Sequence, residues 1–160
     1  MPIPEFVVEL RRKVGQDLLW LPGVTAVVFD AVGRVLLVRR ADTAEWAPIG
    51  GILEPGEEPA ACAVREVLEE AGVRVTVQRL VSLRSEPPGA YPNGDRVQFL
   101  DLTFRCGHVS GEPRPADDEC LDAAWFELED LPSMRERWAA RIRSAVPVDA
   151  PVAFAVPEGD

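Results

Sequence analysis

The stretch from residue 51 to residue 73 constrains this chain more than any other part of it. A loop containing glycine and proline leads there into a run of strong helix formers. Pro59 is suited to the first turn of a helix, and Gly72 is suited to the position just after the last turn. The sequence therefore predicts a loop followed by a helix that starts at Pro59 and stops before Gly72.

Apolar and acidic side chains are expected on opposite faces of this predicted helix, because successive residues are about 100° apart. Four apolar residues share one face: Val64, Val67, Leu68 and Ala71. Three acidic residues are expected on the opposite face, at the spacing that brings helical neighbours together: Glu66, Glu69 and Glu70. We therefore expect three carboxylates to converge on this helix.

Converging like charges call for a compensating cation or for free exposure to water. Exposed carboxylate pairs repel each other by roughly a few tenths of a kcal/mol, and a helix without a use for them more often alternates Glu with Lys. Clustered carboxylate oxygens are hard ligands that suit Mg²⁺ or Mn²⁺, and Mg²⁺ is commonly bound by a few carboxylates together with substrate phosphates. The pattern favours metal-assisted phosphate chemistry, with a solvated acidic helix face as the alternative.

The complete pattern resembles the Nudix box. It runs Gly51, five residues, Glu57, seven residues, Arg65-Glu66, an aliphatic residue, any residue, Glu69-Glu70, any residue, Gly72 and an aliphatic residue. Every fixed position matches, which is far more specific than a short glycine motif. The chain is therefore identified as a member of the Nudix hydrolase superfamily, and the resemblance implies a pyrophosphohydrolase that acts on phosphorus-containing anhydrides.

The resemblance also implies which residues of the box bind metal. Glu66, Glu69 and Glu70 are expected to be ligands of one or more Mg²⁺ or Mn²⁺ ions, and Glu69 or Glu70 is the residue expected to contact two ions. The carbonyl group of Gly51 is expected to be a further ligand.

Three other residues are expected to act beside the metal ligands. The resemblance places Glu57 next to Arg65, so that the pair ties the loop to the helix and aims the ligands. A general base is also required, either from the box or from a later loop. Glu119 stands where many family members carry an acidic residue near the metals. We expect it to be a metal ligand or the base, and a solvated loop carboxylate is the alternative.

Size and composition fit one soluble domain. The chain has 160 residues and is 47% hydrophobic, which is enough for a sizeable core. It has no run of about eighteen apolar residues and no signal-peptide layout, so we expect a cytoplasmic protein with no membrane partner. A net charge of −10 disfavours duplex nucleic acid as a partner and leaves small phosphorylated ligands. The three cysteines lack CxxC spacing and are expected to be reduced packing residues: Cys62, Cys106 and Cys120.

Three parts are expected along the chain: an N-terminal helical segment (1–22), a Nudix domain (23–146) and a C-terminal tail (147–160). Apolar residues at three- and four-residue steps predict an amphipathic helix over residues 4–21, broken or ended near Gly15 or Pro22. Its apolar face is expected either to pack on the protein's own sheet or to form a homodimer contact.

The remaining elements alternate between strands and helices. Strands are predicted over residues 24–30, 34–39, 73–84, 96–106 and 121–128, and loops over 85–95 and 111–119. Ser133 is expected to cap a helix that ends near Ala145. This order indicates an α/β fold with a mixed sheet between helices, and the resemblance implies the Nudix-type α/β/α sandwich.

The substrate is specified less well than the reaction. Arg39, Trp46 and Tyr91 are the candidate substrate-binding residues, and either aromatic ring can stack on a purine, with simple packing as the alternative. In some ADP-ribose pyrophosphatases a proline lies beyond the box as Pro88 does, and in some dinucleoside polyphosphate hydrolases a tyrosine lies as Tyr91 does. The favoured substrate is a nucleoside diphosphate linked to another moiety, such as ADP-ribose, and (d)NTPs or dinucleoside polyphosphates are the alternative.

Two other classes of protein share the fold that the resemblance implies. Isopentenyl diphosphate isomerases need a catalytic cysteine and depart from the box, and ligand-sensing Nudix domains usually carry a winged-helix extension and often a damaged box. The intact box and the lack of such an extension in this sequence favour the hydrolase over both classes.

Overall fold

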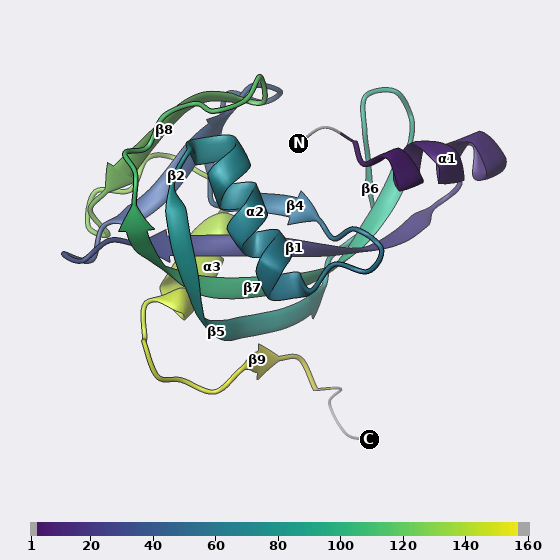
Figure 1. The fold of residues 1–160 in the computed structure, drawn as a ribbon. Coiled ribbons are helices and arrows are strands. Elements are labelled where there is room, and N and C mark those ends of the chain that lie inside the picture. Colours follow the sequence, from purple (N-terminus) through teal and green to yellow (C-terminus); the bar gives the residue numbers. More distant parts are fainter. Residues whose placement is uncertain (1–2, 157–160) are drawn as a thin grey trace.

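The computed structural model describes residues 3–156 of the chain (Figure 1). The helices in this range are α1 (Glu5–Val14), α2 (Pro59–Ala71) and α3 (Glu136–Ala145). The strands are β1 (Leu19–Phe29), β2 (Val35–Arg40), β3 (Trp46–Ala47), β4 (Ile49–Ile52), β5 (Arg74–Ser85), β6 (Gly89–Ala90), β7 (Arg96–Ser110), β8 (Cys120–Phe126) and β9 (Ala153–Phe154). No helix in residues 3–156 is both long enough and apolar enough to cross a membrane.

The strands form one mixed sheet. Its main path runs β3-β2-β1-β7-β5-β9, with β4 paired to β1, β6 to β7 and β8 to β2. β1 and β7 are parallel along the whole of β1, from the pair Leu19 and Val97 to the pair Phe29 and Gly107. β5 and β7 are antiparallel. Parallel and antiparallel pairs therefore meet on the two edges of β7, which confirms the predicted mixed sheet.

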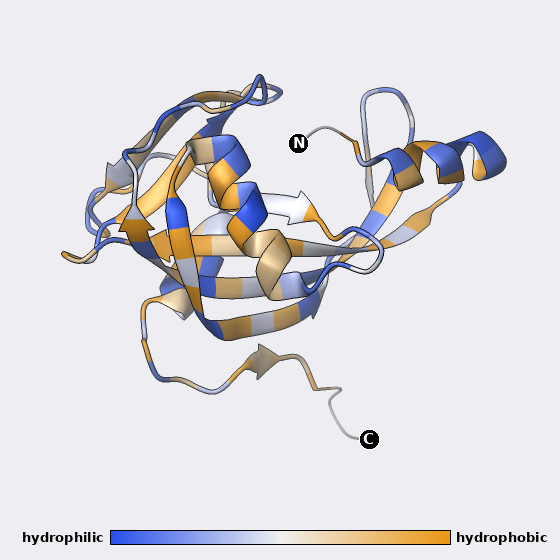
Figure 2. Cartoon of the chain, in the orientation of Figure 1, coloured by the Kyte–Doolittle hydropathy of each residue, from blue (hydrophilic) through white to orange (hydrophobic). Residues whose placement is uncertain are grey.

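Helices cover both faces of this sheet. Alternate residues of a strand point to opposite faces, and along β1 they enter two different cores. Val24, Ala26 and Val28 belong to the core beneath α2, whereas Val27 and Phe29 belong to the core beneath α3. Hydrophobic and hydrophilic positions alternate along α1 and α2, as expected for helices with one face on the protein (Figure 2). The α/β/α sandwich that the sequence predicted is confirmed.

Helix α2 has the predicted boundaries. Pro59 occupies its first turn, where a missing N–H costs no helical hydrogen bond. Gly72 ends it in the left-handed conformation, with φ 68° and its N–H donating to the carbonyl of Leu68 at 3.1 Å. A residue with a side chain is strained in that conformation, so glycine fixes where the helix stops.

The N-terminal helix is shorter than predicted. It ends at Val14, and Gly15, one of the two expected breaks, follows with φ 59°. β1 begins at Leu19, so residues 19–22 of the expected helical segment belong to the sheet. Val7 is buried against Leu21 and Val97. Val7 of the apolar face of α1 therefore packs on the protein's own sheet, whereas Leu10 and Val14 are exposed, and the homodimer contact remains a prediction.

Two smaller expectations are corrected, and part of the expected tail joins the sheet. Ser133 does not cap α3, because the residue at the helix N-cap is Arg135, in an extended conformation. The expected loop over residues 85–95 contains the short strand β6, which pairs with β7. The expected tail contributes β9, which pairs in parallel with Ser82 and Leu83 of β5.

Candidate active site

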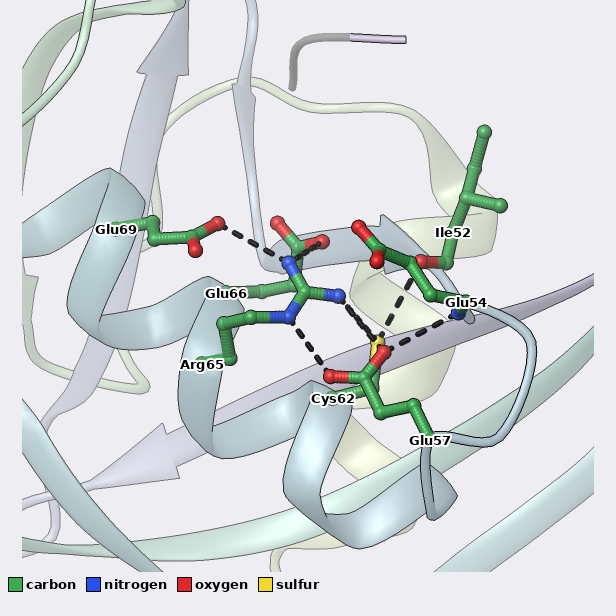
Figure 3. Close-up of polar contacts among 7 residues, drawn as sticks. All are labelled: Ile52, Glu54, Glu57, Cys62, Arg65, Glu66 and Glu69. Carbon is green, nitrogen blue, oxygen red and sulfur yellow. Dashed lines mark hydrogen bonds and ion pairs between the residues drawn. The ribbon is translucent and has the colours of Figure 1, made fainter. Parts of the chain in front are cut away.

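Arg65 of helix α2 lies between the carboxylate groups of Glu57, Glu66 and Glu69 (Figure 3). Its Nε donates to Oε1 of Glu57 at 2.7 Å and its Nη2 donates to Oε2 at 2.9 Å, a two-point ion pair. Its Nη1 lies 2.9 Å from Oε1 of Glu66 and 3.1 Å from Oε2 of Glu69. Glu57 also accepts the backbone N–H of Glu54 at 3.2 Å. The pairing of Glu57 with Arg65 is present, and it ties the loop after β4 to helix α2.

Gly51 of β4 lies directly against Glu66 of α2. A Cβ atom at position 51 would be 2.0 Å from the carboxyl carbon and from Oε1 of Glu66. A side chain at position 51 would push the Glu66 carboxyl group aside, so glycine lets that group lie against the strand. The box thus brings the backbone of Gly51 and the carboxyl group of Glu66 together.

The arrangement of the acidic residues on α2 differs from the prediction. Glu66 and Glu70 are buried, at 2% and 7% exposure, whereas the side chain of Glu69 is 47% exposed and turns to Arg65. Leu68, predicted on the apolar face, is 40% exposed. The face that α2 buries is therefore rotated towards Glu66 and Glu70, because the strands β4 and β8 of the sheet cover that side of the helix.

Burial makes these two carboxyl groups weak acids. Burial raises the pKa of Glu66 to about 7, although Arg65 opposes the shift. Burial raises the pKa of Glu70 to about 8, and the nearby charge of Glu66 adds to that effect. A bound cation would favour the charged form of both groups, because it offsets their desolvation and their mutual repulsion.

The donor set fits a hard divalent cation, although it is not a closed metal site. Among residues 3–156, no group of three Asp, Glu, His or Cys side chains is gathered closely enough to hold a metal ion. Glu69 turns to Arg65 in this structure, so the predicted joint binding of a metal by Glu66, Glu69 and Glu70 stays a prediction. Two adjacent carboxyl groups with raised pKa values remain, and carboxylate oxygens are the ligands that Mg²⁺ and Mn²⁺ prefer.

A cavity of about 430 Å³ opens beside Glu70. Its walls come from the ends of β2 and β8, from β4, from the loop before β7 and from the residue that precedes Pro4. The lining includes Arg40, Asp42, Gly50, Glu70, Tyr91 and Glu119. This volume is in the range of small-molecule sites.

The candidate substrate residues divide into one that lines the cavity and two that do not. Tyr91 lines the cavity. Trp46 packs edge-on against Phe126, with 4.8 Å between ring centroids, at the core beneath α3. Arg39 donates from Nε to the carbonyl of Ala44 at 3.1 Å, outside the cavity lining. Trp46 therefore has the packing role that was the alternative for it.

The cavity also contains residues that sequence reasoning missed. Arg40 lines it instead of Arg39, because neighbouring residues of a strand point to opposite sides. Its Nε and Nη2 donate to the carboxylate of Asp42 at 2.9 and 2.6 Å. Gly50 lines the cavity as well, whereas its neighbour Gly51 does not. The alternation of β2 was the signal that could have separated Arg40 from Arg39.

The cysteines are free and buried, as expected. Burial raises the pKa of each thiol to about 12, so none is a reactive thiolate near neutral pH. The thiol of Cys120 lies 3.7 Å from Oε2 of Glu70.

The chain matches the NUDIX domain family model over residues 19–148. It is 36% identical to a MutT-like protein of Streptomyces ambofaciens, over 77% of this chain and 75% of that protein. It is 35% identical to nucleoside diphosphate-linked moiety X motif 6 of Mus musculus, over 82% of this chain and 40% of that protein. The chain thus spans less than half the length of the mouse relative.

A solved structure shares the architecture. An ADP-ribose pyrophosphatase from Streptococcus suis superposes with a TM-score of 0.62 at 24% identity, over 79% of this chain and 89% of that one. This likeness shows a shared fold, and the sequence matches show common descent. The chain belongs to the Nudix hydrolase family, whose members are enzymes that act on pyrophosphate bonds and generally use a divalent metal.

Proposed function

We propose that this protein hydrolyses the pyrophosphate bond of a nucleoside diphosphate linked to another moiety, with Mg²⁺ or Mn²⁺ as cofactor. The observation that carries the proposal is the position of Glu70, which is buried beside Glu66 and lines the cavity. Among the described residues Glu70 makes no ion pair, and its side-chain donor is the weak S–H of Cys120. Burying a carboxylate without a strong partner is costly, and a cation in the cavity would remove that cost.

Glu66, Glu69 and Glu70 would hold the metal, together with the carbonyl group of Gly51. A bound divalent cation neutralises the oxygens of the phosphoanhydride and lowers the pKa of the attacking water. The protein's own contribution is to fix the ligands. The two-point contact between Glu57 and Arg65 keeps α2 in register with the loop, and the same guanidinium group orients Glu66 and Glu69.

Glu119 is proposed as the general base or as a further ligand. It lines the same cavity as Glu70, and its backbone is anchored on both sides. Its N–H donates to Oδ1 of Asp117 at 3.0 Å, and its carbonyl accepts the N–H of Ala41 at 2.7 Å. An anchored carboxylate at the cavity wall can accept a proton from water.

Replacement of Glu119 by Gln tests this role. The substitution keeps the shape of the side chain and removes its basicity, so kcat at saturating Mg²⁺ should fall by about 10²-fold. Steady-state turnover measured over a range of metal concentrations checks the prediction. Near-normal turnover at saturating metal would remove Glu119 from the proposed mechanism.

Two observations support the proposed substrate class: the lining of the cavity and the similarity to a named relative. The cavity has room for part of a nucleotide, and it presents a cation, Arg40, and an aromatic ring, Tyr91, on its wall. The mouse relative is named for a nucleoside diphosphate linked to a further moiety. A net charge of −10 is also better suited to a small nucleotide than to duplex nucleic acid.

A substrate panel tests the proposed function. ADP-ribose, other nucleoside diphosphate conjugates, dinucleoside polyphosphates and (d)NTPs would be incubated with the enzyme and Mg²⁺ or Mn²⁺, and the products identified by chromatography. The expected result is metal-dependent release of a nucleoside monophosphate, with the highest kcat/KM for a conjugate such as ADP-ribose. Glu70→Gln is the matched control for contaminating activity. Equal or better turnover of (d)NTPs would contradict the proposed substrate class, and hydrolysis without metal would contradict the proposed cofactor.

A further inference from the structure

Helix α1 lies outside the part of the chain that matches the family model, yet it is packed next to the cavity. The match begins at residue 19. Val7 of α1 is 5% exposed and belongs to a small core with Leu21, Val97 and Ile52. Ile52 also lines the cavity, and so does Ile3, which precedes the helix. The segment from residue 3 to residue 17 is therefore part of the surroundings of the proposed active site.

Arg11 fastens this segment to the start of β7. Its Nη2 donates to the carbonyl of Arg96 at 2.6 Å, and its Nη1 donates to the carbonyl of Asp17 at 2.6 Å. Its Nε lies 3.7 Å from the carboxylate of Asp95, and its side chain is only 14% exposed. One guanidinium group thus joins the end of α1, the turn that follows it and the end of the loop before β7.

Gln16 holds the tip of the same loop. Its Nε2 donates to the carbonyl of Asn93 at 2.7 Å. The next residue, Gly94, has φ 89°, and a Cβ atom there would be 2.6 Å from the Gln16 amide nitrogen. The loop therefore lies in direct contact with the turn after α1, as the neighbouring positions of α1 and β6 in Figure 1 indicate.

The contacts of Arg11 and Gln16 lie next to the residues that hydrogen-bond to the backbone of Tyr91. The N–H of Tyr91 donates to the carbonyl of Asp95 at 2.9 Å, and its carbonyl accepts the N–H of Gly94 at 2.8 Å. Arg11 contacts Asp95 itself, and Gln16 binds Asn93, the residue before Gly94. A continuous series of contacts therefore connects α1 and the turn after it to the backbone of Tyr91.

We propose that residues 3–17 are a specificity element of the active site, and that Arg11 is a positioning residue that holds Tyr91 against the cavity. The segment contributes one wall directly, through Ile3, and a second wall indirectly, through the Tyr91 loop. The proposal rests on the proposed function, because it treats the cavity as the place where the non-reacting part of a nucleotide binds. In this proposal α1, which lies outside the part of the chain that matches the family model, contributes to substrate affinity.

The single tyrosine of the chain allows a direct test without substrate. Tyr91 replaced by fluorotyrosine gives one fluorine NMR resonance that reports its surroundings. In Arg11→Met, which removes the guanidinium group and keeps the apolar stem, the resonance should shift and broaden. Arg12→Met is the matched control, because Arg12 is exposed on the same helix and makes no hydrogen bond or ion pair with a described residue. The control should leave the resonance unchanged.

Steady-state kinetics on the best substrate of the panel give the second readout. Arg11→Met should raise KM by about tenfold and change kcat by less than about twofold, because the reacting groups on α2 are untouched. Arg12→Met should keep both constants. Gln16→Ala removes an exposed hydrogen bond to the same loop and should also raise KM. If Arg11→Met does not fold, this variant tests whether the segment positions Tyr91.

Two results would overturn the proposal. One is a folded Arg11→Met protein with the wild-type fluorine resonance and the wild-type KM. The other is an equal fall in kcat and in thermal stability with KM unchanged, which is the sign of a merely structural role. If the wild-type enzyme hydrolyses no compound of the panel, the proposed function fails, whereas the fluorine readout still tests whether Arg11 positions Tyr91.

Discussion

Glu66 and Glu70 determine how the metal-free protein should respond to pH. Their carboxyl groups titrate near 4.5 in an unperturbed chain, and burial raises their pKa values to about 7 and about 8 in the fold. The folded state then binds more protons than the unfolded state over this window. The free energy of unfolding is therefore highest below about pH 4.5 with respect to these groups, and it falls as the pH rises to about 8.

Glu70→Gln should make the metal-free protein more stable at pH 8. The amide cannot ionise, so the variant avoids the cost of a buried charge and should gain about 1–3 kcal/mol in free energy of unfolding relative to the wild type. At pH 5 the gain should be much smaller. Denaturant unfolding in the presence of a chelator at both pH values measures it. The exposed Glu69→Gln is the control, and a destabilised Glu70→Gln at pH 8 would show that the carboxylate is satisfied without metal.

The two aromatic candidates should separate in kinetics and stability. Tyr91→Ala removes a ring from the cavity wall and should raise KM about tenfold, whereas Tyr91→Phe keeps the ring and should stay near the wild type. Trp46→Ala opens a gap beside Phe126 and should lower the free energy of unfolding by about 2–4 kcal/mol without raising KM in the folded protein. Substrate titrations and thermal unfolding of the three variants check this. A larger KM for Trp46→Ala than for Tyr91→Ala would reverse the assignment.

At the scale of elements, the pair formed by Glu57 and Arg65 decides how the loop after β4 meets α2. Arg65 holds the pKa of Glu57 below its ordinary value, mainly through their hydrogen bonds. The same guanidinium group contacts Glu66 and Glu69. The loop and the carboxylates of the helix are therefore oriented by one side chain.

A double-mutant cycle tests this coupling. Glu57→Gln and Arg65→Met should each lower kcat by about 10–100-fold, since both disturb the orientation of the proposed metal ligands Glu66 and Glu69. The double variant should be little worse than either single one, because the two residues act as a unit. Arg65→Lys should fail to restore activity, since an ammonium group cannot make the two-point contact. Additive losses in kcat would mean that the two residues act independently.

The sequence predicted the limits of helices and strands well where the conformational preference of a single residue sets the limit. Pro59 and Gly72 gave the correct limits of α2, because a missing N–H and a left-handed glycine act locally. Ser133 was a plausible cap on the same grounds and was wrong, because Leu131 and Met134 on either side of it pack against the core beneath α3, and the helix begins only at Glu136. Tertiary packing overrides a capping preference of about 1 kcal/mol.

The sequence predicted which residues form the acidic part of the candidate site better than it predicted how they are arranged. The box identified Glu66 and Glu70 and the pairing of Glu57 with Arg65. Helical spacing alone placed the acidic face opposite the apolar face, although β4 and β8 bury Glu66 and Glu70 as well. The alternation of β2 separates Arg40 from Arg39. The cavity is built from segments far apart in the sequence, so no local pattern could show which of the two lines it or reject Trp46.

At the scale of the whole molecule, α2 packs on the mixed sheet, chiefly against β4, β5 and β1. The cavity lies where Glu70 of α2 faces β4 and the ends of β2 and β8. The acidic box forms one side of it, and the Tyr91 loop and the residues before α1 form another. The central claim is that this arrangement exists to bind a divalent cation against a phosphoanhydride.

Titration calorimetry of Mg²⁺ and Mn²⁺ into the protein, with a non-hydrolysable nucleoside diphosphate conjugate present, tests that claim most directly. The account predicts saturable metal binding at pH 7 with release of protons, because the raised pKa values of Glu66 and Glu70 leave them partly protonated before the metal arrives. Glu70→Gln should bind the metal at least about tenfold more weakly. Absence of metal uptake by the wild-type protein, or equal uptake by Glu70→Gln, would contradict the account.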